Sequence, residues 1–273
     1  MRATANGLDT YYEIHGAEND GKEQGRPWLV FSHSLACSTR MWDGQVAAFK
    51  DRYRVLAYDT RGHGRTAAPK GQYTLEGLAD DLHALLKHLK IQKPHFVGLS
   101  MGGMIGQTFA LKYPGVLASL TLADTTSRYP AEAAATWQDR IRVAETKGME
   151  PLVQATLERW FTEPFRINRK DDVARVAAQI LKTPVPGYVG CCHAIPKINV
   201  TARLKELKLP ALVICGEQDP ATPPAMARDI QQNLPGAQLA LIPQAAHLAN
   251  IEQPEAFNRA LGGFLSSPAS ARA

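Results

Sequence analysis

The sequence contains little cysteine, and its cysteines follow no pattern that would form a framework. Four cysteines occur in 273 residues. None belongs to a C-x-x-C pair or to a cysteine and histidine ladder with the spacing of a metal site. We therefore expect neither a disulfide framework nor a bound metal, and we interpret the adjacent Cys191 and Cys192 as packing residues.

The chain also lacks a long apolar run. No stretch approaches the roughly 18 residues that a membrane span requires. The first residues, MRATANGLDTYYEIHG, contain no apolar segment of the kind found in secretory signals. These absences predict a cytoplasmic protein that has no membrane partner.

Positively charged residues slightly outnumber negatively charged ones. There are 31 Lys and Arg residues against 26 Asp and Glu, a formal net charge of +5. Residues 128–210 hold 14 basic against 9 acidic residues, and the rest of the chain holds 17 against 17. The excess therefore lies in one segment. No basic stripe with interleaved aromatic residues occurs, so we expect an anionic small molecule as partner and no nucleic acid.

Short aliphatic runs bounded by Gly, Pro or Asp recur along the chain and predict strands buried on both faces of a parallel sheet. Residues 9–15 alternate instead and predict an antiparallel edge strand. A leucine stripe over residues 75–89 has the period of a helix. This alternation predicts a mostly parallel, doubly wound α/β fold. The parallel strands are predicted at residues 27–32, 53–58, 96–99, 117–123, 211–215 and 238–242.

The alternation stops over residues 127–209. Three helix-like blocks occur there, followed by the proline-rich TPVPGYVGCCHAIPK. A structureless loop of about 80 residues does not fit a compact domain, so we expect a helical lid over the carboxyl ends of the strands, where α/β folds bind ligands. We predict a core of residues 1–126 and 210–273 and a helical cap of residues 127–209. The three blocks are residues 136–147, 151–161 and 171–182.

A G-x-S-x-G pattern is centred on Ser100, directly after the predicted strand 96–99 and before the helix-like MIGQTFALKYP. A sharp strand-to-helix turn leaves no space for side chains two positions from its centre, which explains the flanking Gly98 and Gly102. The pattern predicts a nucleophile elbow that exposes the Ser100 hydroxyl above the sheet.

A serine nucleophile requires a general base that is oriented by a carboxylate. His247 follows the last predicted strand by a few residues and is the favoured base, whereas the other seven histidines have plainer structural explanations. Asp219 follows strand 211–215 in a proline-stiffened loop and is the favoured acid. Asp124, at the end of strand 117–123, is the alternative, and Glu217 is interpreted as structural.

An acyl-transfer site also needs hydrogen-bond donors for its oxyanion. One candidate is the backbone N–H of Met101, directly after Ser100. The other is the backbone N–H of Leu35, in the loop after strand 27–32. In that loop His33 and Ser34 have an alternative role as local hydrogen-bonding residues.

Together these motifs resemble those of the α/β-hydrolase superfamily over nearly the whole chain. The segment YDTRGHGRT resembles the D-x-R-G-x-G turn of that superfamily. The segments SHSLACSTRMWDGQ, HFVGLSMGGMIGQ, WQDRIRVAETKGMEPLV and HLANIEQPEAF have the character of 3-oxoadipate enol-lactonases. The resemblance implies an α/β-hydrolase fold with Ser100 as nucleophile, Asp219 as acid and His247 as base. It also implies cleavage of an internal enol ester that carries a free carboxylate, in the degradation of protocatechuate and catechol.

Such a substrate carboxylate would require an arginine in or near the lid. Arg128 and Arg140 are the candidates, Trp137 and Trp160 would form apolar walls, and His193 is a further lid residue.

Several other functions stay open. The serine argues against epoxide hydrolases and haloalkane dehalogenases, which carry an aspartate at the elbow. Broad carboxylesterases, perhydrolases and carbon–carbon hydrolases keep the same triad. A non-catalytic ligand receptor is disfavoured because all three triad residues are present in the expected order. The expected reaction requires no cofactor, its partner is a small ester or lactone, and a homo-oligomer is compatible with the sequence.

Overall fold

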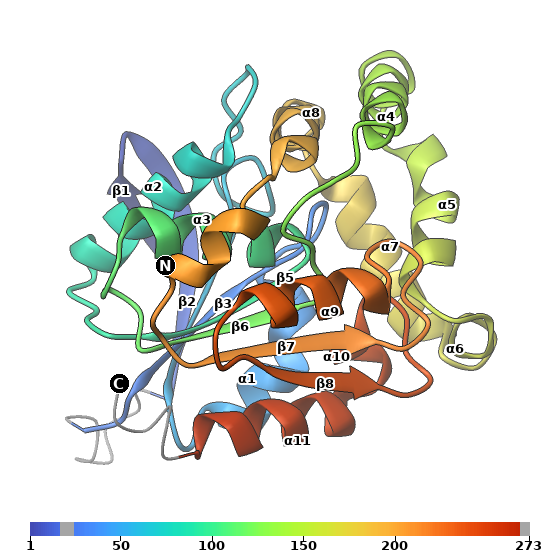
Figure 1. The fold of residues 1–273 in the computed structure, drawn as a ribbon. Coiled ribbons are helices and arrows are strands. Elements are labelled where there is room, and N and C mark those ends of the chain that lie inside the picture. Colours follow the sequence, from blue (N-terminus) through green and yellow to red (C-terminus); the bar gives the residue numbers. More distant parts are fainter. Residues whose placement is uncertain (17–24, 268–273) are drawn as a thin grey trace.

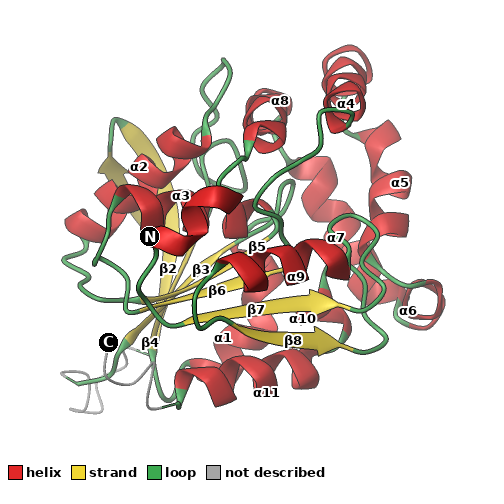
Figure 2. Ribbon diagram, in the orientation of Figure 1, coloured by secondary structure: helices red, strands yellow, loops and turns green. Residues whose placement is uncertain are grey.

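The computed structural model describes residues 1–16 and 25–267, which contain one eight-stranded sheet (Figures 1 and 2). The strand order is β1-β2-β4-β3-β5-β6-β7-β8. The pairs β1–β2 and β2–β4 are antiparallel, and all other neighbours are parallel. The strands are β1 Arg2–Ala5, β2 Leu8–His15, β3 Trp28–Ser32, β4 Arg54–Tyr58, β5 His95–Leu99, β6 Ser119–Ala123, β7 Ala211–Gly216 and β8 Gln238–Ile242.

The predicted mostly parallel α/β sheet is confirmed, and all six predicted parallel strands occur within one or two residues of their expected bounds. The predicted edge position of residues 9–15 is wrong. This segment does pair antiparallel, as β2, but β1 lies outside it. Asn6 and Gly7 join β1 to β2 with φ values of 53° and 68°, the left-handed conformations that a two-residue hairpin turn demands.

Helices cover both faces of the sheet, as a doubly wound fold requires (Figure 1). Helices α1 and α11 pack together on one face, and α2, α3 and α9 lie on the other. The leucine stripe of residues 75–89 forms α2, whose first turn is capped by Thr74. These helices are α1 Asp43–Phe49, α2 Leu75–His88, α3 Met101–Lys112, α9 Pro224–Asn233 and α11 Pro254–Leu265, with the short α10 at Ala249–Glu252.

The segment between β6 and β7 folds into helices that lie beyond the carboxyl ends of the strands, as expected for a lid (Figure 2). The three predicted blocks correspond to α4, α5 and α7. Helix α8 is not among the helices that the sequence predicts. It begins within the proline-rich stretch, where Pro184 and Pro186 occupy its N-terminus, the part of a helix that tolerates proline. The cap helices are α4 Ala133–Lys147, α5 Glu150–Trp160, α6 Glu163–Asn168, α7 Lys170–Lys182 and α8 Val185–Ala194.

An aromatic cluster fixes the loop after β3 to the core. The Phe31 and Trp42 rings stack with centroids 4.7 Å apart, and Trp42 also contacts Phe257 of α11 at 6.2 Å. All three side chains are buried. Burial of each large apolar side chain contributes about 1.5–3 kcal/mol. The loop of residues 33–38, which carries Leu35, is therefore held at both ends by well-packed residues.

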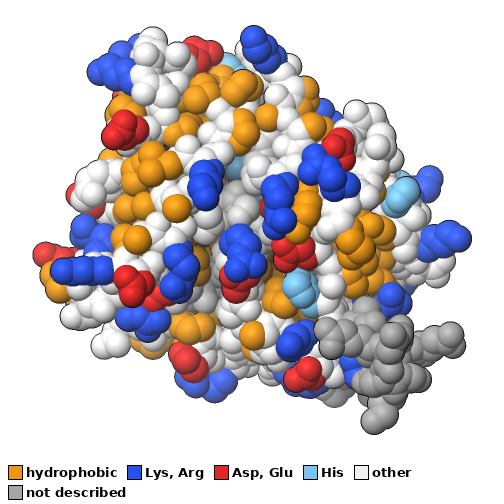
Figure 3. All heavy atoms as spheres, turned by 180° about the vertical axis from the view of Figure 1, so that it is seen from behind, with side chains coloured by type: hydrophobic (Ala, Val, Ile, Leu, Met, Phe, Trp, Pro, Cys, Tyr) orange, Lys and Arg blue, Asp and Glu red, His pale blue; other side chains and the backbone are white. Residues whose placement is uncertain are grey.

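The surface carries mixed charge. On the face shown in Figure 3, Lys and Arg side chains are scattered among acidic and apolar ones and do not form a stripe. Within the part of the chain that the structure describes, no helix combines the length and the apolar character that crossing a bilayer requires.

Candidate active site

The turn between β5 and α3 holds Ser100 in a strained conformation. Ser100 has φ 56° and ψ −115°, and α3 begins at the next residue. A Cβ atom on Gly98 would lie 2.2 Å from the carbonyl oxygen of Gly102, and one on Gly102 would lie 2.1 Å from the carbonyl oxygen of Ser32. Only glycine fits at either position. The turn therefore has the geometry of a nucleophile elbow, with Ser100 half-buried at its tip.

Asp219 and His247 meet at the carboxyl ends of β7 and β8. The Oδ2 atom of Asp219 lies 2.8 Å from Nδ1 of His247, and both side chains are buried. Burial alone would raise the pKa of Asp219, but the charge of His247 and the hydrogen bonds from His247 and Thr222 outweigh it and lower this pKa. Asp219 is therefore an ionised carboxylate that can orient the imidazole.

Thr222 is a site residue that the sequence does not reveal. Its hydroxyl donates to Asp219 Oδ2 at 2.7 Å and lies 3.3 Å from His247 Nδ1. The backbone N–H groups of Ala221 and Thr222 donate to the other oxygen, Oδ1, at 2.8 and 3.0 Å. An aspartate followed by proline favours such a turn, which is the only signal that could have pointed to these contacts.

Asp124, the alternative acid, binds a different partner. Its Oδ1 accepts a hydrogen bond from the backbone N–H of Gly216 at 2.7 Å, so the carboxyl links β6 to β7. Burial, followed by the nearby charge of Asp219, raises its pKa well above the usual value. This environment favours the protonated form of Asp124, which, within the described residues, makes no hydrogen bond to His247.

The Asp124 and Asp219 carboxyls and the Cys215 thiol bring one ligand atom each to within 4.8 Å of one another. This donor set suits a cation poorly. Burial raises the pKa values of both Asp124 and Cys215, which opposes the deprotonation that metal binding requires. The Asp219 carboxylate is already committed to His247 and Thr222. We assign no metal to this cluster.

The loop that carries His247 is tied to the cap. The backbone N–H of Leu248 donates to the carbonyl oxygen of Trp160 at 3.1 Å, and the Trp160 and His247 rings lie 6.3 Å apart. The buried Glu252 accepts hydrogen bonds from the backbone N–H groups of Ala246 at 2.9 Å and Thr162 at 3.1 Å. The sequence did not single out Glu252, which connects the histidine loop to the end of α5.

The two candidate oxyanion donors are compatible with that role. Met101 is the first residue of α3, and Leu35 is buried in the loop after β3. Over residues 1–16 and 25–267 the backbone N–H of neither residue has a recorded hydrogen-bond acceptor. Nearby, buried His33 accepts a hydrogen bond from the Thr60 N–H at 2.9 Å and contacts the Ser34 carbonyl at 2.7 Å, the loop-shaping role considered for it.

The Ser100 hydroxyl makes no hydrogen bond to His247 in the described part of the chain. Catalytic hydrogen bonds often tighten only once substrate binds. Asp219 and His247 are thus in direct contact. The role of Ser100 as nucleophile stays a prediction that rests on the geometry of its turn.

Two cap arginines, Arg140 and Arg159, interact through their charges, and neither has an acidic partner among the described residues. Arg140 stacks on the Trp137 ring, with Cζ 4.5 Å from the centroid. Burial, and then the charge of Arg140, lower the pKa of Arg159. Burial is the largest cause that raises the pKa of Tyr129 to about 12. The charges of Arg140, Asp219 and Arg159 also affect this pKa. Neither arginine forms a salt bridge with any residue in the described ranges. Arg159, which the sequence did not indicate, joins Arg140 as a candidate anion ligand.

The two remaining candidates lie elsewhere on the cap. Arg128 pairs with Asp229 of α9 at 3.5 Å, and its side chain is 62% exposed. His193 is half-buried and lines a cavity of about 490 Å³ with Lys70 and Glu145. No described contact joins either residue to Asp219 or His247, and their roles in binding stay untested predictions.

The fold and this site define a class of protein. Residues 27–254 match the alpha/beta hydrolase fold family, and the chain belongs to it. Within the family it is similar to 3-oxoadipate enol-lactonase 2 of Acinetobacter baylyi, at 37% identity over 236 residues that cover 86% of this chain and 87% of the relative. The protein is therefore an α/β hydrolase that is similar to 3-oxoadipate enol-lactonases.

Solved structures agree in fold. The enol-lactonase from Burkholderia xenovorans LB400 matches with a TM-score of 0.93 and 36% identity, covering 98% of this chain and 100% of that one. A thermophilic esterase from Thermogutta terrifontis, solved with malate bound, matches with a TM-score of 0.89 and 29% identity, covering 97% of each chain.

Proposed function

We propose that the protein is a serine hydrolase that cleaves a carboxylic ester or lactone bearing a free carboxylate, with 3-oxoadipate enol-lactone as its substrate. The observation that carries the proposal is the buried Asp219–His247 pair at 2.8 Å, combined with the strained turn at Ser100. The similarity to enol-lactonases supports the choice of substrate.

The proposed reaction has two steps. In the first, Ser100 Oγ attacks the lactone carbonyl while Nε2 of His247 takes the hydroxyl proton, and Asp219 stabilises the imidazolium through Nδ1. The backbone N–H groups of Leu35 and Met101 stabilise the oxyanion. The ring C–O bond then breaks as the His247 imidazolium gives its proton to the leaving enolate oxygen, and the resulting enol tautomerises to a ketone. In the second step water attacks the acyl-Ser100 with neutral His247 again as base, and the Ser100–acyl bond breaks as His247 returns the proton to Ser100 Oγ.

The substrate carboxylate is proposed to bind Arg140 and Arg159. Two half-buried guanidinium groups that lack a counter-ion repel each other, and a bound carboxylate removes this cost. Trp160 directly follows Arg159, and its ring lies 6.3 Å from that of His247. Tyr129 interacts with the charges of Arg140, Arg159 and Asp219, which supports one pocket in which the carboxylate lies at the cap and the ester carbonyl lies at Ser100.

The first test asks whether Ser100 is the nucleophile. Ser100→Ala should reduce kcat by on the order of 10⁴–10⁶-fold, as expected when one member of a catalytic unit is removed. Circular dichroism should show an unchanged fold. Turnover of a p-nitrophenyl ester at the normal rate by this variant would remove Ser100 from the mechanism.

The second test separates a lactonase from a general esterase, the function favoured by the match to the Thermogutta enzyme. We expect kcat/KM to be higher for the anionic enol-lactone than for neutral short-chain aryl esters. Arg140→Gln and Arg159→Gln should each lower kcat/KM for the anionic substrate by roughly 10- to 100-fold, the value of a charged hydrogen bond. Both should leave the neutral esters unaffected. A preference for neutral esters would establish a carboxylesterase instead.

A further inference from the structure

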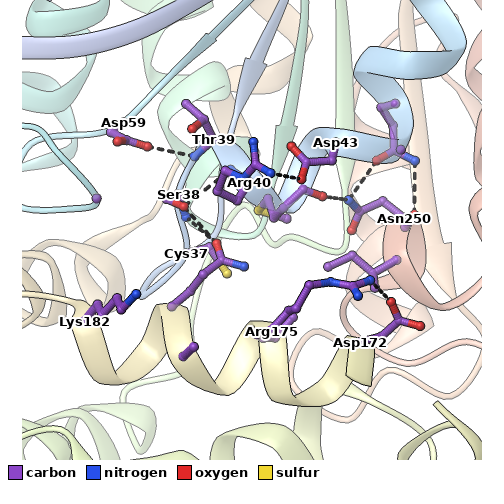
Figure 4. Close-up of a pocket in the computed structure, with 18 of the residues that line it drawn as sticks. Cys37, Ser38, Thr39, Arg40, Asp43, Asp59, Asp172, Arg175, Lys182 and Asn250 are labelled. Carbon is purple, nitrogen blue, oxygen red and sulfur yellow. Dashed lines mark hydrogen bonds and ion pairs between the residues drawn. The ribbon is translucent and has the colours of Figure 1, made fainter. Parts of the chain in front are cut away.

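A second cavity lies at the seam between cap helix α7 and the loop and helical segment that follow β3 (Figure 4). Its volume of about 610 Å³ falls in the range of small-molecule sites, roughly 300–1,000 Å³. Ser100, His247 and the cap arginines of the candidate active site are not among its lining residues. We call this space the seam cavity.

Positive charge is in excess around the seam cavity. Five basic side chains line it, against three acidic ones. Of the acids, Asp59 accepts hydrogen bonds from two backbone N–H groups, those of Thr39 at 2.7 Å and Arg65 at 2.8 Å, and interacts with the charge of Arg65. Arg65 also pairs with Glu13 at 2.9 Å, so its charge is already balanced. The basic residues are Arg40, Arg65, Arg169, Arg175 and Lys182, and the acidic ones are Asp43, Asp59 and Asp172.

The remaining acids are shared among more cations than they can balance. Asp172 pairs with both Arg169, at 2.6 Å, and Arg175. Asp43 pairs with Arg40 at 3.1 Å on the opposite wall. Lys182 has no acidic partner among the described residues. Cations from the core and from the cap therefore face a common space in which Arg40, Arg169, Arg175 and Lys182 are only partly balanced by Asp43 and Asp172.

We propose that the seam cavity binds a small organic dicarboxylate, separately from the site at Ser100. Two carboxylates would balance the excess charge, one at Arg40 on the core wall and the other at Arg175 and Lys182 on α7 (Figure 4). Between these walls the lining includes the apolar side chains of Met41, Val176 and Ile251, which suit a hydrocarbon body.

Binding in the seam cavity would fasten the cap to the core. Gln179 of α7 already accepts hydrogen bonds through Oε1 from the backbone N–H of Ser38 at 3.1 Å and from its hydroxyl at 2.9 Å. Both residues line the cavity. A dianion held by Arg40 and Lys182 adds a second link between the same two elements. Ser38 lies three residues after Leu35, so the bound dianion also stabilises the loop that carries the candidate oxyanion donor.

The proposal is tested with the Ser100→Ala protein, in which turnover cannot interfere, by calorimetric titration at low ionic strength. The probes are phthalate, benzoate and benzyl alcohol, which share an aromatic ring and carry two, one and no carboxylates. We expect phthalate to bind, benzoate to bind more weakly and benzyl alcohol not to bind. A failure of phthalate to bind overturns the proposal.

Charge-reversal variants locate the bound phthalate. Lys182→Glu should weaken phthalate binding at least about tenfold, because repulsion replaces attraction. Lys147→Glu changes the net charge equally at the last turn of another cap helix, α4, outside the cavity, and should leave affinity unchanged. Arg140→Gln should also leave it unchanged. Affinity that is insensitive to Lys182→Glu, or lost in Arg140→Gln, would place the phthalate elsewhere and overturn the proposal, whatever the role of Ser100.

Discussion

Two buried aspartates close to each other differ in the partner that each carboxyl binds. Asp219 contacts His247, which lowers its pKa, whereas Asp124 binds the backbone of Gly216 and has a raised pKa because it is buried. An asparagine therefore means a different change at each position. At 219 it removes a charge and the acceptor that sets the histidine tautomer, and at 124 it keeps a side-chain oxygen that can accept the Gly216 N–H.

Asp219→Asn should accordingly reduce kcat by on the order of 10³–10⁴-fold, the effect of leaving a catalytic imidazole in the wrong tautomer. Asp124→Asn is the matched control, because its side-chain oxygen can still accept the Gly216 N–H, and its kcat should remain close to that of the unchanged protein. Steady-state rates on one ester substrate test both variants. The reverse ranking would assign the acid role to Asp124.

Some residues of the candidate site can be predicted from the sequence, and others cannot. The pattern around Ser100 predicts its turn because glycine is required at two fixed positions, and that requirement depends only on local geometry. Thr222 and Arg159 could not be found in this way. A threonine in a loop and an arginine on a cap helix are common surface residues, and only folding shows that one contacts Asp219 and the other lies beside Arg140.

At the scale of elements, the cap helix α8 rests directly on the core loop after β4. A Cβ atom on Gly187 would lie 1.9 Å from the carbonyl oxygen of Gly62. The backbone N–H of Tyr73 donates to the carbonyl of Gly190 one turn further along α8, at 3.1 Å. The contact cannot accommodate an added side chain without a backbone shift, because both surfaces consist of backbone atoms.

Gly187→Ala should therefore destabilise the protein by roughly 1–3 kcal/mol, the usual cost of overpacking, despite the better helix propensity of alanine. Gly263→Ala in α11 is the control. Apart from its chain neighbours and the backbone of its own helix, no described atom lies within 4 Å of its added methyl group, so this variant should be neutral or more stable by up to about 1 kcal/mol. Urea unfolding of both variants measures the difference, and equal stabilities would mean that α8 can move away from Gly62 without cost.

Each element that the sequence missed has its own physical reason. Parallel strands were predictable because burial on both faces makes them continuous apolar runs. Strand β1, RATA, alternates and is short, and the informative signal was the Asn6–Gly7 turn that follows it. Helix α8 was obscured by prolines, which end a helix in its interior but are accepted at its start.

For the whole molecule, the two buried histidines next to the candidate site link stability to pH. His33 and His63 are fully buried, with ring centroids 5.3 Å apart. Burial lowers the pKa of His33 to about 4. It also lowers that of His63, with a further contribution from His33, to about 3. Both values lie below the 6.5 expected in the unfolded chain. As the pH falls from 6.5 towards 4, the unfolded state gains protons that the folded state does not bind, and the folded state loses stability.

The free energy of unfolding should therefore decrease between pH 6.5 and pH 4. Each histidine contributes about 1.4 kcal/mol for each unit by which the pH falls below 6.5, a total of several kcal/mol at pH 4. His33→Asn should be less stable at pH 7, because Thr60 loses its acceptor, but its stability should decline less steeply with acid. His88→Asn, on the exposed face of α2, serves as control and should follow the unchanged protein. Urea midpoints at pH 7, 6, 5 and 4 give the three slopes. Parallel slopes for all three proteins would show that the protons taken up on unfolding in acid bind to carboxylates and not to this histidine.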